Sequence, residues 1–330
     1  MPLRLLHVFP SFAIGGMQTQ FATLANALGG SCHHVVVTLD GRMQCRAKLD
    51  AATPHEVVAA PPGSAAGLRA APAIRSFLRD RKPDAVATYN WGAIEWCAIA
   101  RAARIAPVIH AEHGFGPDEA DRLLARRNLF RRLALAGGVK LVVPSLALRD
   151  IARRHWGVGP AAIRHIPNGI DIARIAGRVA ARPAPFARRT GELILGAVSP
   201  LVAVKDLGCL LRVFAGIAAA DGRWRLVLAG DGPERSGLEA EAGRLGVAPR
   251  VSFLGSLDDP APALALFDAL AMTSRSEQMP YAVLEAMALA KPVVATDVGD
   301  IAAMVAAENR PLIRPRDDTA GLAAALRRLA

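Results

Sequence analysis

The sequence predicts an α/β protein of two domains, each built on a parallel β-sheet. The chain has 330 residues, a length typical of two domains. Apolar runs of strand length alternate with segments of helical periodicity in both halves. Residues 180–191, rich in proline and arginine, show no regular pattern. We therefore predict a first domain at 1–179, a linker at 180–191 and a second domain at 192–330, with a cleft between the domains.

The first half begins with a strand, a glycine loop, a helix and a second strand, which together form a βαβ unit. Because strands joined by a helix run parallel, this unit predicts a parallel sheet. The predicted strands are 3–10, 34–39, 84–89, 107–110, 140–144 and 163–166, and the predicted helices are 17–28, 68–80, 91–104, 122–136 and 146–155.

The second half repeats this architecture without repeating the sequence. Pro280 marks the start of one helix, because proline suits the first helical position, where its missing N–H would be unpaired. The predicted strands are 193–198, 224–229, 251–254, 269–272 and 293–295, and the other predicted helices are 207–220, 234–245 and 260–267.

Composition limits the classes of function. Lys plus Arg exceed Asp plus Glu by 40 − 29 = 11, which suits anionic ligands, an anionic membrane surface or nucleic acid. Dispersed arginines and an aromatic content of 5% argue against nucleic acid. The four cysteines form no Cys-x-x-Cys pair, and no apolar stretch reaches the roughly 18–20 residues of a membrane span. We expect a cytoplasmic protein, soluble or at most peripheral at the membrane.

The stretch at 274–299 is the most informative one. It places Glu277 before a predicted helix and Glu285 within it, with seven residues between them. The N–H groups and the dipole at a helix N-terminus attract phosphate, and a carboxylate accepts hydrogen bonds from sugar hydroxyls. The stretch therefore suits a ligand with both phosphates and hydroxyls. The alternative is that both glutamates are ordinary solvated side chains.

Three further positions are candidates for binding. Gly15-Gly16, between a strand and a helix, would let a ligand approach the backbone closely, unless it is an ordinary tight turn. His113 lies in a loop at the carboxyl end of a strand, where open α/β sheets bind ligands, although it could simply cap that loop. Glu112 beside it is either a second acid or solvated. Lys205 would direct a compact charge at phosphates, or lie on the surface.

Arginines are concentrated at 122–132. Leu123, Leu129, Phe130 and Leu133 share one side of the predicted helix, but the arginines are spread around it. This is not a clean amphipathic membrane helix. The segment either docks on a membrane surface or an anionic acceptor, or carries solvated arginines.

Several motifs follow one another in the order in which one enzyme family carries them. They are Gly15-Gly16, EHG at 112–114, PNGID at 167–171, VKD at 204–206, AGDGP at 229–233, FLG at 253–255, SRSE-x7-EAMA at 274–288 and PVVATDVG at 292–299. With these motifs the chain resembles the glycosyltransferase family 4 enzymes, retaining nucleotide-sugar transferases of the GT-B fold. The resemblance spans nearly the whole chain and is more specific in the second half. It implies two Rossmann-like domains whose parallel sheets face each other across a cleft.

The resemblance implies how the donor diphosphate is held. Gly15 and Gly16 correspond to the glycines that let backbone N–H groups reach it. Lys205 corresponds to the lysine that contacts it, and the amides of Tyr281 and Ala282 to the helix start that receives phosphate oxygens. No Asp-x-Asp pair is present, which fits the metal-independent chemistry of the family. No cofactor is implied beyond the donor itself, a UDP- or GDP-sugar.

The resemblance also implies the contacts to the sugar and the nucleoside. His113 and Glu277 correspond to the residues that contact the transferred sugar, and they are the implied catalytic residues. Glu285 corresponds to the glutamate that binds the nucleotide ribose. The family retains the anomeric configuration by attack from the front face, without a carboxylate nucleophile.

Some positions depart from the family pattern. Ser199-Pro200 replaces the usual Gly-Arg pair, so the second cation on the diphosphate is missing, and Arg275 is a candidate to supply it. Gln278 replaces a glycine and is where we expect donor preference to be set, and Gln18 replaces a glutamate. The chain ends before the family's usual final helix, which indicates a short subfamily or a truncated chain.

We therefore expect a retaining glycosyltransferase that moves a sugar from a nucleoside-diphosphate sugar to a lipid-linked or polysaccharide acceptor. Its expected partners are this donor, a glycan or lipid-linked acceptor and the membrane surface, and not nucleic acid. Two alternatives remain open. One is a catalytically weak nucleotide-sugar-binding protein, and the other is a different GT-B enzyme such as an epimerase.

Overall fold

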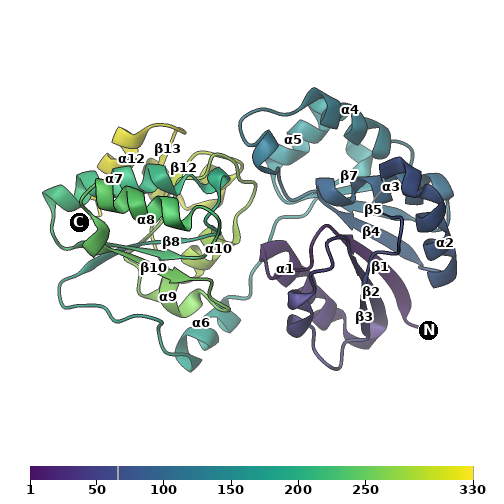
Figure 1. Ribbon diagram of the computed structural model, residues 1–330, viewed down its shortest axis with the longest axis horizontal. Helices are drawn as coiled ribbons and strands as arrows, with labels where there is room; N and C mark the ends of the chain where they lie inside the picture. The colour runs from purple at the N-terminus through teal and green to yellow at the C-terminus, as the bar shows by residue number, and fades with distance from the viewer. Residues whose placement is uncertain (65–66, 330) are drawn as a thin grey trace. The chain divides into compact units, whose positions relative to one another are not determined.

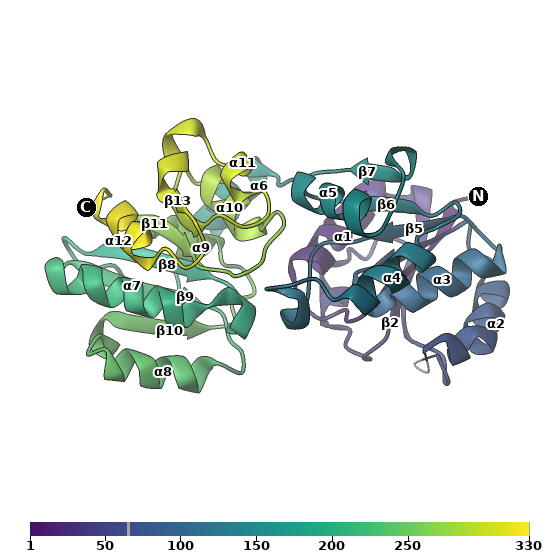
Figure 2. The ribbon, with the colours of Figure 1, turned by 90° about the horizontal axis from the view of Figure 1, so that it is seen from above.

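The computed structural model describes residues 1–64 and 67–329, which fold into two compact units (Figures 1 and 2). Unit 1 comprises Met1–Phe115 and Leu123–Pro167, and unit 2 comprises Gly116–Arg122 and Asn168–Ala330. The passage into unit 2 at 167–168 precedes the predicted linker. In the described part of the chain, no helix combines the length and apolar character required to cross a membrane.

Unit 1 is a seven-stranded parallel sheet in the order β3-β2-β1-β4-β5-β6-β7. Its strands are β1 Leu3–Phe9, β2 Cys32–Thr38, β3 His55–Ala59, β4 Ala85–Tyr89, β5 Val108–Ala111, β6 Lys140–Val143 and β7 Ile163–His165. Its helices are α1 Gly16–Leu28, α2 Ala71–Arg81, α3 Ile94–Ala103, α4 Ala125–Ala134 and α5 Leu146–His155.

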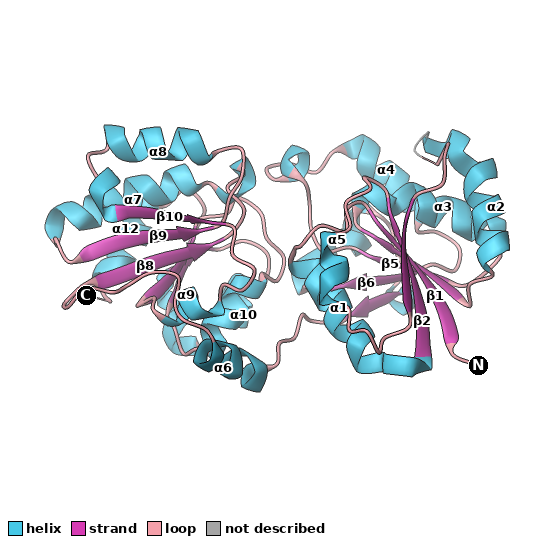
Figure 3. Cartoon of the chain, turned by 60° about the horizontal axis from the view of Figure 1, so that its bottom comes forward, coloured by secondary structure: helices cyan, strands magenta, loops and turns pink. Residues whose placement is uncertain are grey.

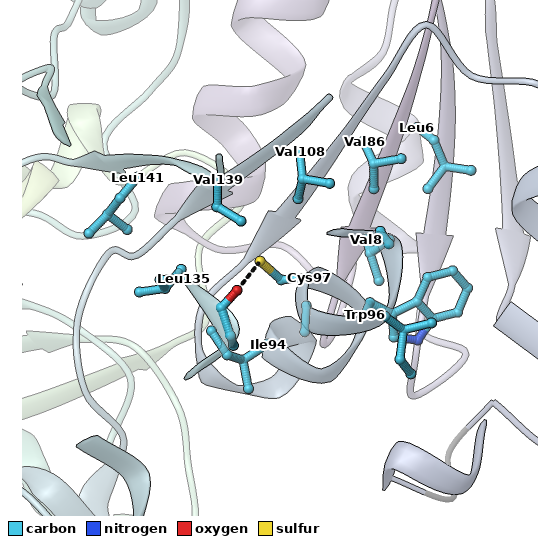
Figure 4. Packing of buried hydrophobic residues seen from close by; sticks show 14 of the residues in the cluster. Leu6, Val8, Val86, Ile94, Trp96, Cys97, Val108, Leu135, Val139 and Leu141 are labelled. Carbon is cyan, nitrogen blue, oxygen red and sulfur yellow. Dashed lines mark hydrogen bonds between the residues drawn. The ribbon is translucent and has the colours of Figure 1, made fainter. Parts of the chain in front are cut away.

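Side chains of this sheet fill a core on each face, because successive residues of a strand point in opposite directions. Leu6 and Val8 of β1 pack under α2, α3, α4 and α5, whereas Phe9 packs against α1 on the other face. Figure 4 shows Leu6 in line with residues of the neighbouring strands, and Cys97 of α3, whose Sγ lies 3.9 Å from the carbonyl oxygen of Ala134. The core therefore fixes α3 and α4 against the sheet.

Unit 2 is a six-stranded parallel sheet in the order β10-β9-β8-β11-β12-β13. Its strands are β8 Leu193–Val198, β9 Trp224–Ala229, β10 Val251–Gly255, β11 Ala269–Met272, β12 Val293–Thr296 and β13 Ile313–Arg314. Its helices are α6 Ile172–Ala181, α7 Leu207–Ala220, α8 Arg235–Arg244, α9 Ala261–Ala265, α10 Tyr281–Ala288, α11 Ile301–Met304 and α12 Thr319–Arg327.

Helices cover both faces of this sheet as well (Figure 3). α7, α8 and α12 enclose one core, and α9, α10 and α11 enclose the other. Strand β12 contributes to both cores, with Val294 in the first and Val293 and Ala295 in the second. The predicted α/β class with two parallel sheets is thus confirmed.

The structure adds elements that the sequence did not predict. β3 forms the edge of the first sheet, and β13 that of the second. α6 occupies residues on either side of the boundary predicted at 179, and it packs against α9 and α10 of unit 2. Helix α6 therefore belongs to unit 2, and unit 2 begins before the domain boundary predicted at 179.

Each sheet has one position where the strand order reverses, between β1 and β4 in unit 1 and between β8 and β11 in unit 2. At such a switch point the loops that leave the carboxyl ends of the two strands run in opposite directions and leave a crevice for a ligand. The loops after β1, β4, β8 and β11 are therefore the first places to look for a site.

Candidate active site

In unit 2, the switch point brings Lys205 and Glu277 together. Lys205 lies at the end of the loop after β8, and Glu277 lies in the loop after β11. The Lys205 ammonium donates a hydrogen bond to Oε1 of Glu277, and the Ser274 hydroxyl donates to the same oxygen at 2.8 Å. Both charged side chains are largely buried, with 19% of Lys205 and 11% of Glu277 exposed. The pair is a charged site that the two loops build jointly.

The Glu277 loop is held by hydrogen bonds from neighbouring segments. Thr273 donates its hydroxyl to the carbonyl oxygen of Asp206 at 2.9 Å, and Thr296 donates to that of Ser274 at 2.6 Å. The Asn168 side-chain amide donates to the carbonyl oxygen of Met279 at 2.8 Å. Asn168 belongs to the PNGID motif, so the structure gives this motif the role of supporting the loop.

Two glycines allow backbone segments to approach the site closely. Gly299 has a φ of 61°, and a Cβ there would lie 2.4 Å from the carbonyl oxygen of Glu277. Gly230 has a φ of 153°, and a Cβ there would lie 1.8 Å from the carbonyl oxygen of Ser199 in the loop after β8. Any larger residue would displace one of the two loops that carry the charged pair.

Helix α10 begins directly after the Glu277 loop. Pro280 is its N-cap and supplies no capping side chain. As in the first turn of any α-helix, the N–H groups of Tyr281 and Ala282 have no carbonyl partner within the helix. Glu285 lies one turn further, 16% exposed, with its Oε1 3.7 Å from the Arg178 guanidinium of α6. Arg178 also binds Asp259 through two contacts of 3.0 Å. Sequence reasoning missed Arg178, which lies at the edge of the predicted linker.

Arg275 does not have the surroundings of a free phosphate ligand. Its guanidinium lies 2.8 Å from Asp121, 3.5 Å from Asp206 and 3.4 Å from Asp317. Three carboxylates thus balance its charge, which argues against the suggestion that Arg275 replaces the missing arginine. Gln278, the other unusual residue of this loop, is buried.

In unit 1, Gly15 and Gly16 follow β1 at its switch point. Helix α1 begins at Gly16, with Gly15 as an N-cap that has no side chain to occupy the first N–H groups. Gln18 donates its side-chain amide to the carbonyl oxygen of Ser11 at 2.9 Å and so fixes the turn before the helix.

His113 lies in the loop after β5 and is partly exposed. Its backbone N–H donates to Oδ1 of Asn90 at 2.7 Å, which ties the His113 loop to the end of β4. Burial within the protein lowers the pKa of His113 to about 4, against an opposing effect of Glu112. At neutral pH the imidazole is therefore uncharged and can either donate or accept a hydrogen bond.

Glu112 is neither solvated nor available as a second acid at the surface. Its side chain is fully buried, 3.4 Å from Nε of Arg131 and 3.8 Å from Nε2 of His110. Arg131 is fully buried too, with its guanidinium 4.9 Å from the ring centroid of Trp91 and 5.0 Å from that of Trp156. Both interpretations of the arginine-rich segment are therefore wrong for Arg131, which belongs to the interior of unit 1.

Two family models match the chain, one in each half. Residues 14–174 match Glycosyltransferase Family 4, and residues 192–330 match Glycosyl transferases group 1. Among curated proteins, the putative glycosyltransferase EpsF of Bacillus subtilis (strain 168) is 31% identical over 51% of this chain and 45% of its own length. D-inositol 3-phosphate glycosyltransferase of Saccharomonospora viridis is 28% identical over 75% of this chain and 62% of its own length. The chain thus spans about half the length of these relatives.

Solved structures show the same fold. HepE of Anabaena, solved in complex with UDP and glucose, superimposes with a TM-score of 0.80 at 20% identity and covers 98% of this chain and 88% of its own. Sucrose-phosphate synthase of Thermosynechococcus elongatus gives a TM-score of 0.80 at 19% identity, with 99% and 90% covered. With its two parallel-sheet units this chain has the GT-B fold, and its first half matches Glycosyltransferase Family 4 and its second half the group 1 glycosyl transferases.

Proposed function

We propose that this protein transfers a sugar from a nucleoside-diphosphate sugar to an acceptor, with retention of the anomeric configuration. The observation that carries the proposal is the buried Lys205–Glu277 pair at the switch point of unit 2, directly before the N-terminus of α10. One place thus offers a cation and free N–H groups for a diphosphate and a carboxylate for sugar hydroxyls.

The charges suit the departure of a nucleoside diphosphate. As the glycosidic bond breaks, negative charge grows on the leaving phosphate, and Lys205 and the amides of Tyr281 and Ala282 would stabilise it in the transition state. We propose that these groups stabilise the leaving diphosphate as a divalent cation does in other transferases. Gly15 and Gly16 are proposed to offer further backbone N–H groups to the diphosphate.

Glu277 suits a binding role better than a nucleophilic one. Its Oε1 already accepts hydrogen bonds from Lys205 and Ser274, so its electron density is shared with two donors. We therefore propose that its other oxygen accepts a hydroxyl of the transferred sugar, that neutral His113 contacts this sugar near the reacting carbon, and that attack comes from the front face. Glu285 is assigned to the ribose hydroxyls.

The acceptor is proposed to be a lipid-linked or polysaccharide intermediate. Helix α4 supports contact with an anionic membrane surface, because Leu129 and Leu133 are 60% and 61% exposed one turn apart, beside exposed Arg132. The apolar side chains would enter the interface while the Arg132 guanidinium binds a headgroup.

Calorimetric titration with UDP and with GDP tests the donor site. We expect one of them to bind with a Kd in the micromolar range, and the matching nucleotide sugar to yield an α-linked product from an α-linked donor, as detected by NMR. If neither UDP nor GDP binds, the proposal is overturned. A product with the inverted anomeric configuration would overturn only the proposed retention. Release of an epimerised sugar without transfer would instead favour an epimerase.

A further inference from the structure

Unit 1 contains a pocket of about 330 Å³ to which none of the roles above assigns a ligand. It is lined by Trp91, Glu95, Arg126, Arg127 and Phe130. Trp91 belongs to the turn after β4, Glu95 to the first turn of α3, and the other three to α4. A volume near the lower end of the roughly 300–1,000 Å³ usual for ligand pockets suits a single substituted sugar rather than an oligosaccharide.

An aromatic wall of this pocket is held rigidly. The Arg131 guanidinium lies 4.9 Å from the centroid of the Trp91 ring, and that of Arg127 lies 5.0 Å from it. Phe130 meets Trp91 edge to face at 5.8 Å. Because Arg131 is itself fixed by buried Glu112, the Trp91 ring has little freedom to move. Trp91 and Phe130 thus give the pocket a rigid aromatic wall of the kind that suits a sugar ring.

Charged groups of both signs border the pocket. Arg126 is exposed, and within residues 1–64 and 67–329 neither it nor Glu95 takes part in an ion pair. The guanidinium groups of Arg126 and Arg127 present planar donors suited to a phosphate or a carboxylate. Glu95 presents acceptor oxygens suited to hydroxyls. The pocket thus combines groups for an anion, for hydroxyls and for a ring face.

The pocket also lies beside the loop that carries His113. Asn90, which accepts the backbone N–H of His113, directly precedes Trp91 in the chain. Both belong to the segment that leaves the carboxyl end of β4, one of the two strands at the switch point of this sheet. The segment that supplies Trp91 to the pocket therefore also holds the loop of His113, the residue assigned to the transferred sugar.

We propose that this pocket binds the acceptor through a saccharide that carries a negatively charged group, either a phosphate or a carboxylate. The inference rests on the transfer function proposed above and defines its acceptor. Arg126 and Arg127 bind the anionic group, Glu95 accepts a hydroxyl, and Trp91 packs against the ring.

Titration of the full chain with glucose 6-phosphate, glucuronate and glucose tests this pocket, followed by calorimetry and by tryptophan fluorescence. We expect at least one anionic sugar to bind about tenfold more tightly than glucose, because a charge-assisted hydrogen bond contributes about that factor. Comparison of glucose 6-phosphate with glucuronate then tells which anion the site takes. Arg126→Ala should remove the preference, and Trp91→Phe should remove the fluorescence change.

Arg79→Ala, at an exposed arginine of α2, is the matched control and should bind like the wild type. Equal affinities for charged and neutral sugars, or equal losses in Arg126→Ala and Arg79→Ala, would overturn the pocket proposal. UDP titration of the same proteins separates the two proposals. If Arg126-dependent sugar binding persists while UDP fails to bind, the donor proposal and the acceptor role of the pocket fall, and the pocket stands as a site for an anionic sugar. If UDP binds but Arg126 has no effect, the pocket proposal falls alone.

Discussion

Glu277 joins the two kinds of chemistry that the proposed reaction requires. Lys205 would hold the diphosphate of the donor, yet in the structure it binds the carboxylate that is assigned to the sugar. In the proposed reaction a single cation would thus link the leaving group to the carboxylate that binds the sugar. Because Ser274 donates to the same oxygen, Glu277 keeps one hydrogen-bond partner even when Lys205 turns toward phosphate.

The substitution Glu277→Gln tests this coupling. The neutral amide keeps the size of the side chain but removes the charge that fixes Lys205 and attracts the sugar hydroxyl. We expect the transfer rate to fall about 100-fold or more, since the lost interaction acts on the developing charge. The affinity for UDP should change by less than about threefold, because the variant removes an interaction of the transition state and not one that binds UDP in the ground state. Rates and calorimetric titrations of the same preparation measure both effects, and a variant with normal transfer would contradict the assignment.

A substitution of Glu285, in contrast, should affect the binding of the nucleotide. Its removal takes away an acceptor for the ribose hydroxyls, so Glu285→Ala should weaken UDP binding by about tenfold, the value of one hydrogen bond to a charged group. The fold should tolerate the change because Arg178 retains Asp259 as a partner. Glu308→Ala, at an exposed carboxylate of unit 2, is the control and should bind UDP normally. Similar UDP affinities for the two variants would remove Glu285 from the site.

At the scale of elements, the docking of α4 depends on a buried ion pair. Arg131 contributes the only fully buried guanidinium among the described residues, and Glu112 meets it from the end of β5. Removal of one partner from such a pair leaves an unpaired charge in the interior, whereas replacement of both by apolar groups often costs little. The pair therefore matters more for where α4 sits than for how stable unit 1 is.

Arg131→Met should lower the free energy of unfolding by about 3 kcal/mol or more, since Glu112 is left buried without its cation. The double variant Glu112→Leu/Arg131→Met should recover much of that loss. Arg132→Met, at the exposed neighbouring arginine, should change stability by less than about 0.5 kcal/mol. Urea unfolding monitored by circular dichroism measures all three. Equal losses of stability in Arg131→Met and Arg132→Met would show that the buried ion pair contributes no more to stability than an exposed arginine does.

The same helix shows what sequence patterns can and cannot predict. The apolar spacing of α4 predicted a helix correctly, since that signal is local. The burial of Arg131 depends on Glu112, Trp91 and Trp156, which reach it only through the tertiary fold. Strand β3 was missed because its apolar run is short and leads directly into a loop rich in alanine and proline, and at the edge of the sheet none of its residues is fully buried.

The candidate site, too, has residues that the sequence could predict and contacts that it could not. Glu277, Lys205 and Glu285 could be nominated because the motifs that carry them follow predicted strands or begin a predicted helix. Their direct pairing, the support from Asn168 and the contact of Arg178 with Glu285 join segments far apart in the sequence. No local pattern encodes such contacts. Arg275 is the opposite case. Its position in the sequence suggested a role in binding the diphosphate, but in the structure three carboxylates balance its charge.

At the scale of the molecule, the two units differ in how they can respond to acid. All eight histidines belong to unit 1, at positions 7, 33, 34, 55, 110, 113, 155 and 165. Burial, aided by His34, lowers the pKa of His7 to about 3, and burial also lowers that of His34. Nε2 of His7 lies 3.1 Å from Nδ1 of His34, and its Nδ1 lies 3.1 Å from the hydroxyl of Tyr89. The contact between the two ring nitrogens requires one of them to carry no proton, so the two rings cannot both be charged.

These shifts predict that acid destabilises unit 1 before unit 2. A histidine whose pKa is lower in the folded state than the roughly 6.5 of the unfolded chain contributes stability that is complete above about pH 6.5. The contribution is lost as the pH falls from there toward the folded pKa, because only the unfolded chain takes up the proton. For His7 alone the loss at about pH 5 amounts to about 2 kcal/mol. His113 acts in the same direction, whereas unit 2 has no histidine to protonate in this range.

Urea unfolding at about pH 7.5 and about pH 5 measures the difference, since the proton uptake falls between these values. Three of the four tryptophans, at 91, 96 and 156, lie in unit 1, so Trp224→Phe makes fluorescence a reporter of unit 1 alone. In this variant the fluorescence midpoint should fall at the lower pH by more than the remaining circular-dichroism transition. Adding His7→Phe, which keeps a ring beside Phe21, should reduce the shift of the fluorescence midpoint. A common shift of both transitions that His7→Phe leaves unchanged would mean that the acid sensitivity does not originate in the buried histidines of unit 1.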